Sequence, residues 1–265
     1  MAGEHGEASE PGPFSGVGVA LVTIFHAGGG VDEVATARHA EDLARRGMRA
    51  VLVNGTTGEA GTLTDAERIT LIQAVRKGMP AETSLIAGTG GQSTEAAVEL
   101  TSAAIEAGAD AVLAYPPPGC QRAELHAFFA AVAEAAARHP VLAYHVPWVS
   151  APGVPVDALP GLPVAGIKDS SGSADRLLDE LAHYDGATYV GSSALLALAG
   201  PMGGTGAILA LANVEPERCV RAFAGDAATQ RQLADSHLTV RAGGPAALKR
   251  LLAERSGFSA VSRLT

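Results

Sequence analysis

The sequence lacks several features that mark common protein classes. Its two cysteines, Cys120 and Cys219, are far apart and have no metal-ligand spacing, so we expect free thiols in a reducing compartment. Basic residues form only isolated pairs and the net charge is −9, which argues against nucleic acid as a partner. No apolar run reaches the roughly 18 residues that span a bilayer, and no signal-like segment opens the chain. We therefore expect a soluble cytoplasmic protein with no membrane partner.

Aromatic residues are also scarce, at 4% of the chain, whereas hydrophobic residues make up 47% and there are 32 glycines. Such a composition favours a core of Ala, Val and Leu between closely packed helices and strands, which is typical of α/β proteins. A length of 265 residues is ordinary for a single α/β barrel. Residues 1–15 are rich in Gly, Glu, Ser and Pro without periodicity, and they predict a flexible tail.

Eight short apolar runs follow this segment and alternate with Ala-rich helical patterns. Each run is nearly continuously apolar, as expected of parallel strands that are covered on both faces. The pattern predicts an α/β fold, a (β/α)8 TIM barrel with its core over 16–212 and a short helical extension over 213–265 packed on it. An open doubly wound sheet is the alternative, weakened because no GxGxxG follows the first run. The expected strands are 17–23, 50–54, 84–88, 111–114, 141–145, 164–168, 188–191 and 206–209.

Capping residues mark where the helices begin. Asp32 opens a helix that runs to Gly47, and Thr64 with Glu67 has the spacing of a capping box. The next helix begins after Ser93 or at Thr94. The five prolines in 147–163 leave room for little more than a turn of helix between strands five and six. Further helices are expected over 122–138, 173–184, 194–200, 215–224, 226–238 and 244–255.

Polar, glycine-rich motifs follow the predicted strands, and in a barrel these positions meet at the C-terminal face, where active sites form. Lys168 ends the sixth apolar run, so its stem is expected inside the barrel mouth. Burial there disfavours the ammonium form and favours the free amine that attacks a carbonyl. Tyr144 ends the neighbouring strand, where a phenol could move protons. The alternatives are a lysine that reaches the rim or pairs with Asp169, and a tyrosine that caps a loop.

Two further features carry weaker signals. The motif Gly-Thr-Thr-Gly-Glu at 55–59 offers backbone N–H groups and two hydroxyls, which suit a small carboxylate, although such turns are often only structural. His145 on an apolar strand is more often a core or rim histidine than a base. No cluster of His and carboxylates occurs at the strand ends, which disfavours a metal-dependent aldolase.

Three motifs occur together in this order and spacing: Gly-Thr-Thr-Gly-Glu at 55–59, Tyr-His-Val-Pro at 144–147 and Gly-Ile-Lys-Asp at 166–169. Together they resemble the dihydrodipicolinate synthase/N-acetylneuraminate lyase family, which contains class I Schiff-base aldolases and related dehydratases. The resemblance implies that Lys168 forms an iminium with pyruvate or another 2-oxo acid and that Tyr144 shuttles protons.

The resemblance also implies the rest of the site. Thr56 and Thr57 would bind the carboxylate of the 2-oxo acid, and the Thr57 hydroxyl would link Tyr144 to a proton relay. Gly191 and Ile208 would line the pocket, with His145 also placed near the substrate. The implied partners are a 2-oxo acid and an aldehyde, with no metal and no cofactor beyond the Schiff base itself. The implied assembly is a homodimer or homotetramer.

The sequence departs from the family at positions that affect the second substrate. Dihydrodipicolinate synthases usually carry a second tyrosine in the relay where Pro116 follows Tyr115 here. They also carry an arginine for a distal carboxylate where this chain has Val149. Losing that cation weakens binding of a carboxylate, so a non-acidic aldehyde is expected. The C-terminal segment is also shorter than usual, which bears on the tetramer.

The leading hypothesis is therefore a lyase of the aldolase type that acts on a 2-oxo acid through Lys168. A dehydratase of a 2-oxo sugar acid would use the same lysine and tyrosine, and release of pyruvate separates the two. Dihydrodipicolinate synthase itself is a third possibility, lowered by Val149 and Pro116. A barrel that binds a small acid without turnover is the fourth, and an unreactive Lys168 would favour it.

Overall fold

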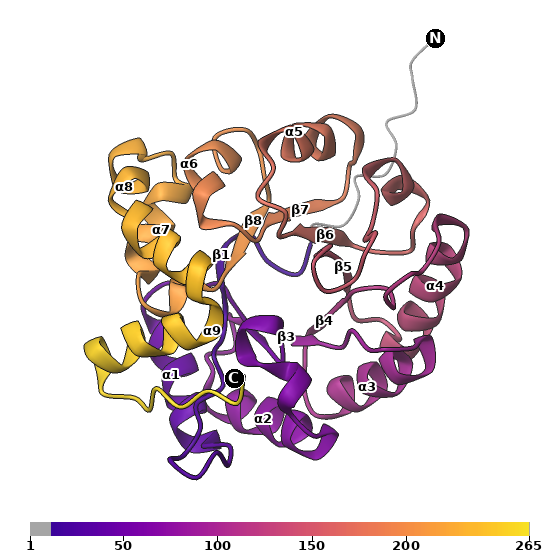
Figure 1. Ribbon diagram of the computed structural model, residues 1–265. Coiled ribbons are helices and arrows are strands. Elements are labelled where there is room, and N and C mark those ends of the chain that lie inside the picture. Colours follow the sequence, from indigo (N-terminus) through magenta and orange to yellow (C-terminus); the bar gives the residue numbers. More distant parts are fainter. Residues whose placement is uncertain (1–11, 265) are drawn as a thin grey trace.

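The computed structural model describes residues 12–264, so most of the tail predicted over 1–15 lies outside the described residues. Eight parallel strands close into a barrel in the order β1 to β8, and helices surround it (Figure 1). The (β/α)8 barrel predicted from the apolar runs is thereby confirmed. The strands are β1 Gly16–Ala20, β2 Ala50–Val53, β3 Ser84–Gly88, β4 Ala111–Ala114, β5 Val141–His145, β6 Gly166–Asp169, β7 Ala187–Val190 and β8 Gly206–Leu209.

Strand β1 is shorter than predicted because the chain leaves the ladder after Ala20. The backbone N–H of Val22 donates to the side chain of Asn213, at 3.2 Å, instead of to a strand. The Thr23 hydroxyl donates to the carbonyl oxygen of Gly58, at 2.7 Å. These contacts bend the end of β1 toward the loop that follows β2. Apolar character alone could not show this, since residues 21–24 are buried whether or not they lie in the strand.

The helices begin at the predicted caps. Asp32 accepts a hydrogen bond from the Ala35 N–H at 2.9 Å, and Thr64 forms the expected capping box with Glu67. Between β5 and β6 there is only a 3-10 helix, Val156–Gly161, as the prolines predicted. The α-helices are α1 Glu33–Arg45, α2 Asp65–Gly78, α3 Thr94–Glu106, α4 Leu125–Ala136, α5 Ala174–His183, α6 Leu196–Ala199, α7 Pro216–Phe223, α8 Ala227–Gln232 and α9 Ala234–Ser256.

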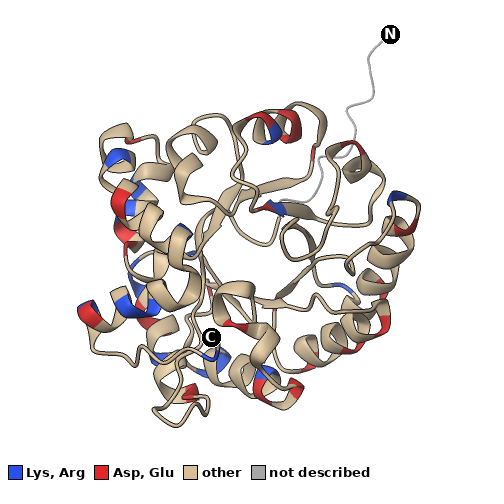
Figure 2. Ribbon diagram, viewed as in Figure 1, with Lys and Arg blue, Asp and Glu red and all other residues tan. Residues whose placement is uncertain are grey.

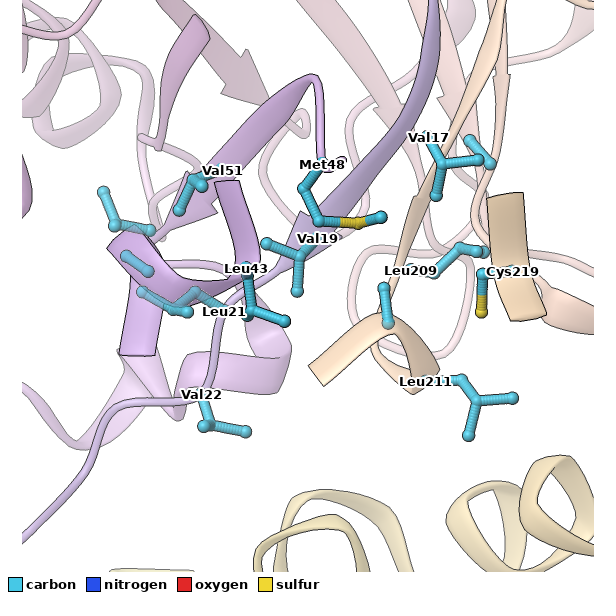
Figure 3. Close-up of a cluster of buried hydrophobic side chains, with 14 of the residues drawn as sticks. Val17, Val19, Leu21, Val22, Leu43, Met48, Val51, Leu209, Leu211 and Cys219 are labelled. Carbon is cyan, nitrogen blue, oxygen red and sulfur yellow. The ribbon is translucent and has the colours of Figure 1, made fainter. Parts of the chain in front are cut away.

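The core has an inner and an outer part because side chains of a strand alternate between its two faces. On β1, Val17 and Val19 point outward and pack with Leu43 of α1 and with Met48 (Figure 3). Ala20 of the same strand belongs to the barrel interior. The interior is sealed near the start of the strands by Phe14, whose ring stacks on Tyr189 at a centroid distance of 4.6 Å. Because the lower barrel is filled, only the C-terminal end of the strands can open into a site.

Helix α9 crosses the C-terminal face of the barrel. It contacts the 3-10 turns that follow β2, β7 and β8, and it passes in front of β1 and β8 in Figure 1. Two helices, over 226–238 and 244–255, were predicted here. The backbone angles of Gly244, φ 55° and ψ −149°, are not helical, and this kink divides α9 into two helical parts. The second part, which ends at Ser256, matches the helix predicted over 244–255, whereas the short α8 and the first part of α9 replace the single helix predicted over 226–238. Gly244 accepts the positive φ and Pro245 follows it, which is why the sequence pattern breaks at this point.

The helical extension predicted after the barrel is present, but the division at residue 212 into a core and an extension stays a prediction. Within residues 12–264, no helix is both long enough and apolar enough to cross a membrane.

Candidate active site

A cavity of about 600 Å³ opens at the C-terminal ends of the strands. Its walls come from β5 and β6, from the turns after β2, β7 and β8, and from helix α9. The structure thus brings together six of the seven residues that the sequence marked for the site. The six are Lys168, Tyr144, Thr56, Thr57, Gly191 and Ile208.

Lys168 and Tyr144 are neighbours because β5 and β6 pair in register at these two residues. The Lys168 side chain is 3% exposed, and its Nζ lies 4.5 Å from the centroid of the Tyr144 ring. Within the described chain, this Nζ makes no hydrogen bond or ion pair with another residue. Asp169 does not pair with it, since its carboxylate accepts hydrogen bonds from the N–H and hydroxyl of Ser171 at 2.8 and 2.7 Å. The amine is therefore buried next to a phenol without a counter-ion.

The Tyr144 phenol has a hydroxyl partner that differs from the expected one. Ser170 donates a hydrogen bond to the Tyr144 phenol oxygen at 3.2 Å. Thr57 lines the same cavity, but no hydrogen bond joins it to Tyr144. Gly191 makes room for this arrangement, since a Cβ atom there would lie 2.1 Å from the Ser170 Oγ. A proton of the phenol can thus exchange with a second hydroxyl that faces the cavity.

The turn with Thr56 and Thr57 is a 3-10 helix, Thr56–Gly58, that ends at Glu59 in the left-handed conformation. The Glu59 carboxylate is fully buried and forms an ion pair with Lys249 of α9. Its second oxygen accepts hydrogen bonds from the backbone N–H groups of Arg263 and Leu264, at 2.7 and 3.1 Å. The hydroxyl-bearing turn is therefore fastened to α9 and to the last residues of the chain.

His145 does not line the cavity, and here the structure corrects the expectation. Tyr144 points into the barrel, so the next residue along the strand points out toward the helices. The His145 Nδ1 accepts a hydrogen bond from the Val154 N–H at 3.1 Å. Burial, together with the charge of Arg176, lowers the pKa of His145 to about 4. His145 is therefore a neutral histidine that holds the loop with Val154 behind the site.

Behind β6, Arg176 lies close to two buried carboxyl groups, those of Glu180 and Asp169. Its Nε lies 2.9 Å from a carboxylate oxygen of Glu180 and 3.6 Å from one of Asp169. The Glu180 contact is close in distance but lacks hydrogen-bond geometry, and both Glu180 oxygens are buried without a hydrogen-bond partner in the described chain. Burial consequently raises the pKa of Glu180 to about 7.

Sequence reasoning missed the residues that α9 adds to the cavity. His237, Val240 and Arg241 all line it, and His237 Nδ1 lies 2.8 Å from the hydroxyl of Ser193. The exposed Trp148, with 63% of its surface accessible, stands at the same cavity. No motif marks these positions, because their role depends on where α9 crosses the barrel.

A second cavity of about 490 Å³ lies on the other side of Tyr144 and Thr56, both of which line the two cavities. Tyr115 and Val149 line only this second one. The ring centroids of Tyr115 and Tyr144 are 6.4 Å apart with an edge contact. Across residues 12–264, no three His, Cys, Asp or Glu side chains gather in a way that could hold a metal ion.

Comparison with known proteins gives matches along most of the chain. The model of the Dihydrodipicolinate synthetase family matches residues 13–242. A 4-hydroxy-tetrahydrodipicolinate synthase from Stutzerimonas stutzeri is 37% identical over 230 residues, which cover 81% of this chain and 77% of that protein. The synthase from a Synechococcus strain is 43% identical over 141 residues, which cover 52% of this chain and 46% of that protein.

Solved structures agree with these matches. The dihydrodipicolinate synthase from Acinetobacter baumannii, solved in complex with pyruvate, has a TM-score of 0.87 at 28% identity and covers 95% of this chain and 91% of that one. A second, from Bacillus anthracis, has a TM-score of 0.86, also at 28% identity, with 96% and 92% covered. With the family match and the common barrel, the resemblance of the three motifs is confirmed. The chain belongs to the dihydrodipicolinate synthetase family and is a lyase of the class I aldolase type.

Proposed function

We propose that this protein makes or breaks a carbon–carbon bond next to the carbonyl of pyruvate or another 2-oxo acid, through a Schiff base on Lys168. One observation carries the proposal. The sequence has only three lysines, and Lys77 is exposed while Lys249 is engaged by Glu59. Lys168 alone combines burial, a place in the main cavity and an amine without a counter-ion in the described chain.

The proposed reaction begins when the Lys168 amine attacks the C2 carbonyl of the 2-oxo acid. Loss of water gives an iminium, and loss of a proton from C3 gives an enamine. The enamine carbon then attacks the carbonyl carbon of an aldehyde, whose oxygen takes up a proton. Hydrolysis of the iminium releases the product and restores the amine. Cleavage is the same sequence reversed, and no metal or separate cofactor enters it.

The side chains next to Lys168 can transfer protons and bind the substrate carboxylate during this reaction. We assign the proton transfers to the Tyr144 phenol, because its ring lies against the Lys168 amine and its oxygen is bonded to Ser170. We assign the substrate carboxylate to the hydroxyls and backbone N–H groups of Thr56 and Thr57. The wall opposite would be formed by Gly191 and Ile208.

Intact-protein mass spectrometry after borohydride reduction tests this proposal. With pyruvate, wild type should gain one reduced pyruvyl group, and peptide mapping should place it on Lys168. Lys168→Ala should gain none, while Lys77→Ala, the matched control on the surface, should behave as wild type. An adduct that persists in Lys168→Ala, or none with pyruvate or any other 2-oxo acid, would refute the assignment and favour a binding protein without turnover.

A second measurement separates the two reaction types that this lysine can support. An aldolase working in the cleavage direction releases pyruvate, whereas a dehydratase acting on a 2-oxo sugar acid releases none. The aldolase is the proposal, since the cavity is far larger than a three-carbon acid requires and leaves space for a separate aldehyde. We further propose a homodimer or homotetramer, which light scattering of the purified protein measures directly.

A further inference from the structure

The wall of the main cavity that α9 forms carries a positive charge. His237, Val240 and Arg241 are spaced by three and four residues, so they lie on one face of the helix, and all three line the cavity. The cavity that contains Lys168 is thus lined partly by a helix, although the sequence motifs lie only at the ends of strands. A substrate bound at Lys168 and extending across the mouth meets this face.

Arg241 has no anionic partner in the part of the chain that the structure describes. Among residues 12–264 it forms no ion pair, in contrast to Arg255 and Arg263, which are paired with Glu215 and Glu67. None of the described residues that line the cavity is an aspartate or a glutamate. This is unusual for a chain of net charge −9, whose charged residues lie mainly on the outer helices (Figure 2). The cavity is consequently suited to an anion.

The face with Arg241 is held in place at both ends. Gln230 donates a hydrogen bond to the carbonyl oxygen of Ser193 at 2.9 Å, and the Ser193 hydroxyl contacts His237. Beyond the bend at Gly244, the second part of α9 is fastened by the Lys249–Glu59 ion pair. The helix that carries Arg241 is therefore docked on the turns after β7 and β2, which also form the site.

His237 adds a neutral donor beside the cation. Burial, together with the charge of Arg241, lowers the pKa of His237. In the tautomer whose Nδ1 accepts from the Ser193 hydroxyl, the ring proton is on Nε2 and can be donated to a substrate. Four serines at positions 170, 171, 192 and 193 contribute hydroxyls to the same cavity. These groups match a hydroxylated chain that ends in an anion.

We propose that Arg241 binds an oxyanion, a carboxylate or a phosphate, at the far end of the aldehyde substrate. This inference rests on the proposed aldol reaction at Lys168 and names the class of its second substrate. It reverses the expectation of a non-acidic aldehyde, which considered only the position of Val149. That residue lines the second cavity, so the cation comes from the C-terminal helix and not from the loop after β5.

The test compares aldehydes that differ only in the charged end, with pyruvate saturating. Glyceraldehyde 3-phosphate is paired with glyceraldehyde, and succinic semialdehyde with butyraldehyde, and kcat/KM is measured from pyruvate consumption. Wild type should prefer the charged member of at least one pair. Arg241→Gln should lower kcat/KM for that member by roughly 10- to 100-fold, as expected for loss of a hydrogen bond to a charged group. The kcat/KM for the neutral member should fall far less, because that aldehyde has no anion for Arg241 to bind.

Three controls make the outcome specific. Arg250→Gln, which removes an exposed arginine from the same helix, should leave both members unchanged. Arg241→Lys should restore part of the preference, because it keeps the charge without the planar fork. Higher ionic strength should weaken the preference of wild type, since the cation is exposed at the rim. The pair that responds tells carboxylate from phosphate.

Equal use of charged and neutral aldehydes by wild type would overturn the inference, as would an equal loss for both members in Arg241→Gln. Failure to use any of the charged aldehydes, with the pyruvyl adduct intact, would also overturn it. Borohydride trapping of pyruvate in Arg241→Gln keeps the two proposals apart. A normal adduct there leaves Lys168 established whatever Arg241 does, whereas no adduct in wild type refutes the proposed function itself.

Discussion

Replacement of Lys249 by methionine should destabilise the protein strongly. Lys249 and Glu59 form an ion pair in which both side chains are 0% exposed. The ammonium group also donates a hydrogen bond to the carbonyl oxygen of Val261 at 2.9 Å and lies 4.0 Å from the centroid of the Phe25 ring. Burial lowers the pKa of Lys249, and the contact with Glu59 opposes that shift. Methionine keeps the apolar stem but leaves the Glu59 carboxylate without its cation.

The expected loss follows from the contacts that remain. Removing one partner of a buried ion pair costs about 3–5 kcal/mol. Glu59 keeps hydrogen bonds from the N–H groups of Arg263 and Leu264 and from the Ser262 hydroxyl, all to its second oxygen. These bonds continue to stabilise the carboxylate, so we expect a loss of about 3 kcal/mol, the lower end of the range. For a domain of this size, that corresponds to a fall in Tm of roughly 6–12 °C.

Urea unfolding followed by far-UV circular dichroism measures this loss. The single tryptophan, Trp148, is exposed and reports poorly on the core. Lys77→Met, which removes an exposed lysine at the end of α2, is the matched control and should leave the free energy of unfolding unchanged. The double variant Lys249→Met with Glu59→Gln should recover part of the loss, because no unpaired charge is then buried.

A loss below about 1 kcal/mol in Lys249→Met would refute this reasoning, because an exposed ion pair contributes no more than that. Activity provides a second readout. Since Glu59 ends the turn that carries Thr56 and Thr57, loosening it should raise KM for pyruvate more than it lowers kcat. A change in kcat alone would show that the turn does not depend on the ion pair.

Three other predictions concern the hydroxyl bonded to Tyr144, the space that Gly191 leaves for it, and the buried carboxyl group of Glu180. Ser170→Ala removes the hydroxyl that is bonded to Tyr144 and should lower kcat roughly 5- to 10-fold, as for loss of one hydrogen bond, with the yield of pyruvyl adduct unchanged. Gly191→Ala should impair the enzyme mainly through its clash with the Ser170 Oγ, and the double alanine variant should recover toward the activity of Ser170→Ala; a double variant no better than Gly191→Ala contradicts this. Burial raises the pKa of Glu180 from 4.5 to about 7. Between these two pH values the folded protein keeps a proton on Glu180 that the unfolded chain has lost, so the free energy of unfolding falls as the pH rises from 4.5 to about 7. Urea unfolding at pH 4.5 and 7.5 measures this effect. The free energy of unfolding of Glu180→Gln, relative to that of wild type, should increase by on the order of 3 kcal/mol between the two pH values. The same pH dependence of stability in both proteins would contradict the raised pKa.

The barrel could be predicted because its signal is local. A parallel strand covered on both faces must be apolar along its length, so eight buried strands appear as eight apolar runs. Caps such as Asp32 and Thr64 act within three residues and are visible in the same way. The ends of elements were less certain, since the departure of Val22 from the ladder depends on Asn213, far along the chain.

The candidate site was predictable to the extent that strand ends build it. Lys168 and Tyr144 were expected together because neighbouring strands of a barrel end at one face, and β5 and β6 place them in register. His145 was expected there too, and the structure turns it away. A shift of one residue along a strand reverses the direction of the side chain, and the sequence does not show which of two polar neighbours points inward.

By itself, the sequence determined the (β/α)8 architecture, and it predicted the barrel face and the lysine of the proposed site. Only the tertiary structure decided which hydroxyl reaches Tyr144, that Glu59 meets Lys249, and that Arg241 joins the cavity. The physical reason is the range of the contacts involved. Periodicity and capping act between residues close in the chain, whereas α9 acquires its role only by crossing the barrel mouth, where it meets turns that are distant in sequence.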